Sequence, residues 1–442
     1  MKIPSIAPTF LEIYSKLPPE SLARALRPGV PDDYRHWDEL KHRSPPNGLS
    51  RDEWWCALKL QRFATKKQIP LFGPDGEPFS FSVPDTIGRQ LHEIDLGAGG
   101  RIGIPELVAN ADQRDQYLIR SLMEEAITSS QLEGAVTTRE VAKEMLRSGR
   151  SPRDKSEKMI LNNYRTMRRI RDLKQAPLTP ELVFELHRMV TEDTLDIPGA
   201  AGRFRTPEEL ITIEDDAGEI MHLPPKATQL PARMEAMCSF ANSDSIEPFV
   251  HPVIRAMILH FWLAYDHPFV DGNGRTARAL FYHSMLRADY WLFEFISISD
   301  ILKRAPTKYY RAFLYSETDE NDLTYFLLHQ SDVIRKAIAS LHEHIAKKSI
   351  EIRDTRHFLK NWRHLNPRQQ ALLAHALRHP GFAYTIEGHQ TSHDTSYNTA
   401  RTDLLALAEE QLLDLHKQGR KMIFFPTESL ETTIKSGGHS TS

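Results

Sequence analysis

The residues best suited to chemistry lie in one short segment, residues 267–278, which reads His-Pro-Phe-Val-Asp-Gly-Asn-Gly-Arg-Thr-Ala-Arg. Gly272 and Gly274 allow backbone conformations that turn successive N–H groups toward one point, which forms a nest for an anion. A helix is expected to begin near Arg275, and the N-terminus of a helix is itself an anion site. Asn273 adds a side-chain donor between the glycines. The pattern predicts a phosphate-binding loop.

Two arginines strengthen this interpretation. Arg275 and Arg278 are three residues apart, so both lie on one side of the first turn of the expected helix. Guanidinium groups match the oxygens of phosphate. Arginine at a helix N-terminus opposes the helix dipole, and a bound polyphosphate would reverse that penalty. The placement therefore favours a polyphosphate ligand.

A carboxylate and an imidazole complete the set. Asp271 is a hard oxygen ligand beside the nest, and Mg²⁺ commonly takes one or two carboxylates together with phosphate oxygens. His267 can accept a proton near neutral pH. We expect nucleotidyl or phosphoryl transfer to a hydroxyl. A plain turn between two helices is the competing interpretation, although it does not explain the histidine, aspartate and arginines together. Calcium binding of the EF-hand type is excluded because Phe269 and Leu280 stand where its first and last acidic ligands belong.

The elements that must position this loop are mostly helical, so the expected fold class is mainly α. A helix over 252–266 leads into the loop, and apolar residues recur at helical spacing over 113–135. Residues 147–158 are polar and broken by Pro and Gly, which is typical of a linker. Helical patterns then continue to about residue 345. The exception is 209–223, where two strands flank an Asp-Asp-Ala-Gly turn at 215–218 and predict a β-hairpin.

The C-terminal region has a different pattern. Helices over 368–378 and 395–413 precede two short strands, 412–415 and 422–425, which flank a basic tip at 417–421. This order predicts a winged helix-turn-helix over 346–425. DNA is a candidate partner of this region, through Arg401 and through Lys417, Arg420 and Lys421. A protein-docking or dimerisation module is the alternative. Residues 426–442 are rich in Ser, Thr and Gly and are expected to be disordered.

Composition excludes several classes of protein. The 442 residues carry 56 Lys and Arg against 59 Asp and Glu, so the chain as a whole is not a basic nucleic-acid binder. Two cysteines exclude a disulfide framework. The start of the chain is unlike a signal peptide, and no apolar run is long enough to span a membrane. We expect a cytoplasmic protein without a membrane partner.

The loop resembles the core motif of the Fic (Fido) domain family, His-x-Phe-x-Asp/Glu-Gly-Asn-Gly-Arg-x-x-Arg, at all eight specified positions. Residues 202–205 and the hairpin after them are similar to the family's entry to its flap. The resemblance covers about residues 100–345. It implies an all-helical Fic core with a β-hairpin flap at 151–345, an inhibitory helix segment at 101–150, and protein adenylyltransferase activity. Residues 1–100 receive no role from it.

The resemblance also implies roles for the loop residues. His267 would be the base that deprotonates a Ser, Thr or Tyr hydroxyl on a target protein, or on the chain itself. Asp271 would hold Mg²⁺ between the α- and β-phosphates of ATP, the AMP donor. Gly272, Asn273 and Gly274 would form an anion hole. Arg275 and Arg278 would bind the β- and γ-phosphates. Relatives that phosphorylate have Lys at the position of Gly274, so glycine here favours adenylylation. The flap would dock a target segment by strand addition.

A second motif, Ser-Ser-Gln-Leu-Glu-Gly at 129–134, resembles the family's inhibitory sequence. Ser129 and Glu133 are four residues apart and share a helix face. The resemblance implies that Glu133 pairs with Arg278 and so occupies the guanidinium meant for the γ-phosphate. In some relatives this glutamate also assists the removal of AMP. The plain alternative is an ordinary helix end with Gly134 as its stop.

Two other readings of the whole chain stay open at this point. One is a DNA-binding transcriptional regulator in which the Fic fold only senses a nucleotide; the intact His267 argues against it, since binding alone needs no base. The other is a Fic enzyme that uses a different nucleotide donor or removes AMP. A homodimer is a further candidate assembly that the sequence does not decide.

Overall fold

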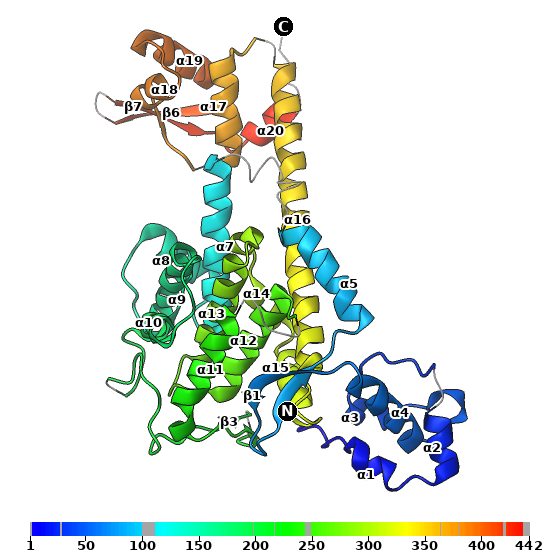
Figure 1. Ribbon diagram of the computed structural model, residues 1–442. Helices are drawn as coiled ribbons and strands as arrows, with labels where there is room; N and C mark the ends of the chain where they lie inside the picture. The colour runs from blue at the N-terminus through cyan, green and yellow to red at the C-terminus, as the bar shows by residue number, and fades with distance from the viewer. Residues whose placement is uncertain are drawn as a thin grey trace. The chain divides into compact units, whose positions relative to one another are not determined.

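The computed structural model describes residues 2–26, 29–99, 111–197, 199–215, 217–243, 249–362, 364–379, 381–418 and 421–435 (Figure 1). The chain divides into two compact units, Met1–Leu341 and His342–Ser442. The division falls inside one long helix, α16 (Thr324–Asn361). The backbone thus has no break at the predicted boundary of 345/346, because no Gly or Pro interrupts residues 324–361.

The first unit begins with a small helical module that has its own core. Its helices are α1 (Phe10–Tyr14), α2 (Pro19–Ala25), α3 (Trp37–Leu40) and α4 (Arg51–Phe63), with a 3₁₀ turn at Pro46–Gly48. Trp55 and Leu58 of α4 pack in this core with Ile13 and Leu40. An antiparallel pair, β1 (Lys67–Phe72) and β2 (Pro78–Phe81), follows, and then α5 (Asp85–Ile94) and a π turn at Asp95–Gly99.

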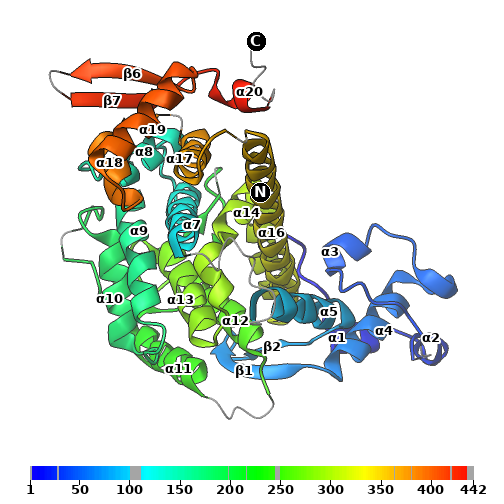
Figure 2. The ribbon, with the colours of Figure 1, turned by 90° about the horizontal axis from the view of Figure 1, so that it is seen from above.

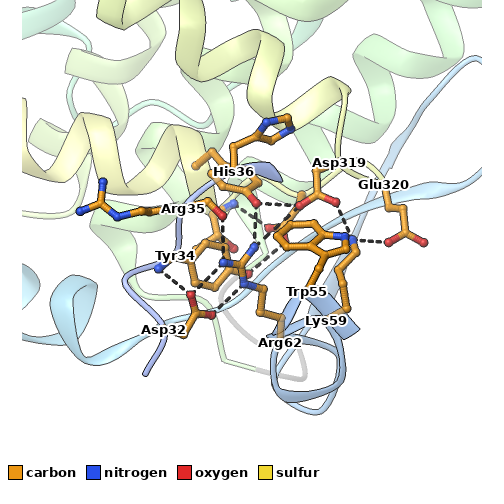
Figure 3. A network of polar contacts seen from close by, with 12 residues as sticks. Asp32, Tyr34, Arg35, His36, Trp55, Lys59, Arg62, Asp319 and Glu320 are labelled. Carbon is orange, nitrogen blue, oxygen red and sulfur yellow. Dashed lines mark hydrogen bonds and ion pairs between the residues drawn. The ribbon is translucent and has the colours of Figure 1, made fainter. Parts of the chain in front are cut away.

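Buried charges join this module to the turn between α15 (Pro306–Glu317) and α16 (Figure 3). Arg62 donates to both carboxylate oxygens of Asp32, at 2.7 and 2.8 Å, and to the Tyr325 hydroxyl at 2.7 Å. Lys59 pairs with Asp319 at 2.5 Å, and Tyr325 donates to the other oxygen of Asp319 at 2.6 Å. The α4 helix therefore docks by its basic side chains onto an acidic turn some 260 residues later in the chain.

The remainder of the first unit is a helical core. Its helices are α7 (Ala111–Leu132), α8 (Arg139–Ser148), α9 (Lys155–Asp172), α10 (Pro180–Thr191), α11 (Leu230–Asn242), α12 (Pro252–Asp266), α13 (Asn273–Arg287), α14 (Ile298–Arg304), α15 and α16, with 3₁₀ turns at Ala227–Gln229 and Trp291–Phe295. Helices α12 and α13 pack side by side at its centre, with α9 and α10 next to α13 (Figure 2). The sequence prediction of a helix over 252–266 is confirmed.

The hairpin between α10 and α11 is shorter than the sequence predicted. Its strands are β3 (Ile213–Glu214) and β4 (Ile220–His222), which pair antiparallel. The expected strand over 209–212 is wrong, because Glu209 accepts two hydrogen bonds from the Arg203 guanidinium and one from the Thr206 N–H. These bonds hold residues 206–209 in a turn, in place of strand pairing.

The second unit contains, beyond the end of α16, α17 (Pro367–Arg378), β5 (Tyr384–Thr385), α18 (Ile386–Ser392), α19 (Tyr397–Glu409), β6 (Leu413–Gln418), β7 (Lys421–Pro426) and α20 (Leu430–Lys435). The strands form a sheet in the order β5-β7-β6. The expectation of disorder from residue 426 is wrong for 430–435, because Leu430 and Ile434 are buried in this unit's core. Residues 436–442 lie outside the described part of the chain.

No helix among the described residues is long and apolar enough to cross a membrane.

Candidate active site

The loop between α12 and α13 is held in a sharp, strained turn. His267, the C-cap of α12, has φ 43°, and Gly272, the N-cap of α13, has φ 82°. A left-handed conformation at a residue other than glycine costs about 1–2 kcal/mol, so His267 must be held there by its surroundings. A Cβ atom on Gly272 would lie 2.6 Å from the Thr191 side chain, so only glycine fits that position.

Arg205 supplies much of this restraint. Its Nε donates to the His267 carbonyl at 2.9 Å, its backbone N–H donates to the Pro268 carbonyl at 2.9 Å, and its guanidinium also donates to the Pro225 carbonyl. One buried arginine thereby joins the start of the loop to the end of the β3–β4 hairpin. In the sequence, Arg205 stands out only as part of the resemblance over residues 202–205, and no role followed from it.

The His267 ring is set up as a neutral base. Its Nδ1 faces the Ala264 carbonyl at 3.2 Å. A carbonyl only accepts, so Nδ1 carries the proton in the neutral ring and Nε2 keeps its lone pair. Burial lowers the pKa of His267 to about 4, and the nearby His222 adds to this depression. The ring is therefore unprotonated at neutral pH and can accept a proton at Nε2.

Asn273 and Phe269 close the loop from inside. The Asn273 amide donates to the Phe269 carbonyl at 2.8 Å, and its oxygen accepts the Phe269 N–H at 3.0 Å. Both ends of that amide thus hold the loop backbone, so the Asn273 side chain also shapes the loop. The Asn273 backbone N–H, in the first turn of α13, is a further donor that an anion could use.

His187, on α10, is a site residue that the sequence analysis missed. Its ring stacks on Phe269 with the centroids 3.7 Å apart and lies 2.9 Å from the Asp271 carbonyl through Nε2. Its Nδ1 accepts the Gly202 N–H at 2.8 Å, so Nε2 carries the proton. His187 is fully buried and fixes the loop from α10. No motif surrounds it in the sequence, and its only signal is a place on the buried face of a helix.

Arg275 is buried with part of its donor capacity unused. It is 1% exposed, and its Nη1 donates to the Val190 carbonyl at 2.7 Å. Among the residues that the structure describes, its Nε and Nη2 find no hydrogen-bond partner, although Nη2 lies 3.6 Å from an Asp271 oxygen. Burial lowers the pKa of Arg275. Buried donors are ordinarily paired, so this guanidinium is shaped for an anionic ligand.

Arg278, in contrast, is engaged by residues at the C-terminal end of α7 and just after it. Its Nε donates to the Ser129 hydroxyl at 2.8 Å, and its Nη2 donates to the Ser129 carbonyl at 3.0 Å and to Glu133 Oε1 at 2.9 Å. The Glu133 carboxylate also lies directly over Gly274, where a Cβ atom would come within 2.1 Å of Oε1. The contact expected between Glu133 and Arg278 is present. An anionic group thus already lies in the nest.

The donor set fits a magnesium-bound polyphosphate. The Asp271 side chain is 47% exposed; one oxygen accepts the Gly272 N–H at 2.5 Å, and the other faces Arg275. An exposed carboxylate beside an under-bonded guanidinium and a glycine nest matches the ligands that magnesium and phosphate take together. Asp271 would hold the metal, and Arg275 with the nest would hold phosphate oxygens.

Comparison with known proteins agrees with this geometry. Residues 177–285 match the family model described as Fic/DOC family. The chain contains a Fic/DOC domain. This domain includes α10, α11, α12 and most of α13, and hence the loop between α12 and α13 together with the helices on either side of it.

Its curated relatives bear the name protein adenylyltransferase Fic. The protein from Nematostella vectensis is 34% identical over 117 residues, which are 26% of this chain and 25% of the relative. That from Drosophila erecta is 30% identical over 166 residues, 38% of this chain and 30% of the relative. The matched regions therefore span less than a third of these relatives. A crystal structure of a Fic family protein from Desulfovibrio desulfuricans G20 shares the fold, with a TM-score of 0.53 at 17% identity, over 78% of this chain and 97% of that one.

Proposed function

We propose that this chain is a protein adenylyltransferase that transfers AMP from ATP to a Ser, Thr or Tyr hydroxyl of a target protein, and that Glu133 holds it inactive. The observation that carries the proposal is that one loop–helix segment contains both a partly buried, neutral His267 and the under-bonded Arg275. A base and a phosphate clamp in this arrangement have no use in a purely structural turn. The names of the curated relatives support the same chemistry.

In the proposed reaction, the target hydroxyl oxygen attacks the α-phosphorus of ATP while His267 Nε2 takes the hydroxyl proton. The bond from the α-phosphorus to the oxygen that bridges to the β-phosphate breaks, and pyrophosphate leaves. Arg275 and the backbone N–H groups around Gly274 hold phosphate oxygens in line. When bound at Asp271, Mg²⁺ would neutralise charge on the phosphates. The β3–β4 hairpin would hold the target segment by strand addition.

The proposed brake acts by competition. Arg278 cannot grip a γ-phosphate while it donates to Glu133, and the carboxylate lies in the space that a phosphate needs beside Gly274. Hydrogen bonds between a guanidinium and a carboxylate are among the stronger ones, which suits a competitor for phosphate. We expect the unaltered chain to be largely inactive on its own.

Intact-protein mass after incubation with ATP and Mg²⁺ tests the proposal. The wild type would be compared with Glu133→Gly, with Glu133→Gly combined with His267→Ala, and with Glu140→Gly, a control at an exposed glutamate of α8. We expect an AMP-sized increment on the chain, or on lysate proteins labelled by tagged ATP, only for Glu133→Gly. Parallel reactions with GTP, CTP and UTP would identify another donor. Labelling that survives His267→Ala would contradict the assigned base.

We also propose that the second unit is a winged helix-turn-helix that contacts DNA. The element order α17, β5, α18, α19, β6, β7 supports this fold. The first turns of α19 expose Tyr397, Asn398 and Arg401, the region from which such helices reach base edges. Lys417 and Lys421 are exposed on the strands beside the tip, whereas Arg420 lies outside the described residues. We expect this unit to bind duplex DNA, with an affinity that falls as salt is added and that falls in Arg401→Ala. An affinity that neither change affects would refute the proposed DNA contact.

A further inference from the structure

Helix α7 faces α13 with a polar stripe that is longer than its inhibitory motif. Glu125, Ser129 and Glu133 are spaced four residues apart, so they lie along one face of α7 and of the turn that ends it. Ser129 and Glu133 contact Arg278, and Glu125 contacts Tyr282, four residues further along α13. The inhibitory helix is thus bound to α13 at two points, and only one of them is the motif.

Glu125 is held more completely than Glu133. It is 1% exposed, and its Oε2 accepts from the Tyr282 hydroxyl at 2.8 Å, the Ser297 hydroxyl at 2.9 Å and the Ser299 N–H at 3.1 Å. Its Oε1 accepts from the Ser299 hydroxyl at 2.5 Å. These donors come from α13 and from the start of α14, so one side chain of α7 joins two neighbouring helices.

The position of such a carboxylate is sharply restricted. None of the ion pairs found in the described residues includes Glu125, so its direct hydrogen-bonding partners are uncharged O–H and N–H donors. A buried carboxylate that loses these donors pays the full cost of desolvation. A slide or rotation of α7 that took Glu133 away from Arg278 as a rigid body would also strip Glu125 of its donors.

We propose that Glu125 is a positioning residue for the brake: it fixes α7 along α13 so that Glu133 meets Arg278. The proposal rests on the proposed function, because it takes Glu133 as the inhibitor. It follows that release of inhibition moves only residues 129–133, at the C-terminal end of α7 and just after it, while the helix stays docked at Glu125. Without the Glu125 carboxylate, α7 loses its fixed point and Glu133 no longer holds Arg278 efficiently.

Epistasis separates this role from a merely structural one. Glu125→Ala and Glu125→Gln would be placed in the wild type and in Glu133→Gly, and the rate of AMP transfer measured. Glu124→Ala is the matched control, because Glu124 is the adjacent glutamate and its ion pairs go to Arg139 and Lys143 on or beside α8. We expect Glu125→Ala to raise the wild-type rate by about tenfold or more, the size expected for lost hydrogen bonds to a charged group. In the Glu133→Gly background, Glu125→Ala should change the rate of AMP transfer by less than about twofold. The effects of the two substitutions are non-additive because both residues act on the same contact.

Glu125→Gln should give a smaller rise, because the amide keeps an acceptor and the serine hydroxyls can reorient. An unchanged wild-type rate in a folded Glu125→Ala protein would overturn the proposal. So would an equal change in both backgrounds, which marks a general effect on the core. If Glu125→Ala fails to fold, Glu125→Gln decides by the same criteria.

Amide hydrogen exchange provides a readout that does not need catalysis. We expect residues 126–133 to exchange faster in Glu125→Ala than in the wild type and in Glu124→Ala. Unchanged protection of these residues would refute the positioning role of Glu125, even if the rates of AMP transfer changed. Absence of AMP transfer in Glu133→Gly would refute the proposed function alone, and the exchange comparison would still decide whether Glu125 fixes α7.

Discussion

Replacing Arg62 by methionine is expected to detach the N-terminal helical module from the core. Methionine keeps the apolar stem of the side chain, out to the position of Nε, but removes the guanidinium. The Arg62 side chain is 1% exposed. Besides its bonds to Asp32 and Tyr325, it donates to the Arg35 carbonyl at 3.0 Å and lies 4.1 Å from the Tyr34 ring centroid (Figure 3). All of these groups would lose their partner together.

The size of the effect follows from that burial. Removing one member of a largely buried charged pair costs about 3–5 kcal/mol, and here Asp32, whose side chain is 17% exposed, would be left without its charged partner. Arg35 provides the control within the same network: its side chain is 34% exposed, and its pairs with Asp33 and Glu39 are 3.4 and 3.3 Å long. Exposed pairs of this kind contribute about 0–1 kcal/mol. The difference between Arg62→Met and Arg35→Met should therefore be about 3 kcal/mol, or roughly a hundredfold in the opening equilibrium.

Native-state proteolysis measures this opening. Protease at a fixed concentration should cut within residues 1–66 of Arg62→Met far faster than in Arg35→Met or the wild type, in proportion to the population of the open form. Asp32→Asn should lie between them, since it removes the charge but keeps a hydrogen-bonding group. Equal cleavage of Arg62→Met and Arg35→Met would show that the buried charges do not hold the module, and the reasoning from burial would be refuted.

Three further predictions concern the loop and the hairpin. Burial lowers the pKa of His222, but its 2.7 Å contact with Glu317, its contact with the Tyr265 carbonyl and the nearby Asp266 together raise the pKa more. The net shift is upward, so the stabilisation is complete below the unfolded pKa. Protection of the hairpin from amide exchange should fall as pH rises through the folded pKa, and Glu317→Gln should move that loss to lower pH; a flat profile would contradict the linkage. His267 should give the brake-free variant an acid limb of AMP transfer with a midpoint near pH 4, and a midpoint near the ordinary histidine value would argue against a buried base. Gly272→Ala should leave the protein folded by circular dichroism yet reduce AMP transfer by about tenfold or more, because of the positive φ and the clash with a threonine side chain; full activity would show that the loop tolerates a Cβ there.

Local signals predicted well those parts of the site that depend on neighbours in sequence. The helix over 252–266 and the turn after it follow from apolar spacing and from glycine placement, which act over a few residues. The hairpin strands came out too long because Glu209 is bound by Arg203, six residues earlier, and no β pattern reveals such a pair. The helix at 430–435 was missed because burial of Leu430 and Ile434 against the second unit's core outweighs a polar composition.

The amino-acid sequence by itself determined which functional groups the site contains. They are a histidine, an aspartate, two glycines and two arginines in one short segment, and a glutamate in a second motif far upstream. Only the tertiary structure decided which of these groups are free. The Asn273 amide is bonded to the loop backbone, and Arg278 is bonded to Glu133, 145 residues away in sequence. Arg275 keeps donors that no described residue bonds. The reason is physical: a residue's type sets what it can donate or accept, whereas its burial and its partners, brought from distant helices, set what remains for a ligand.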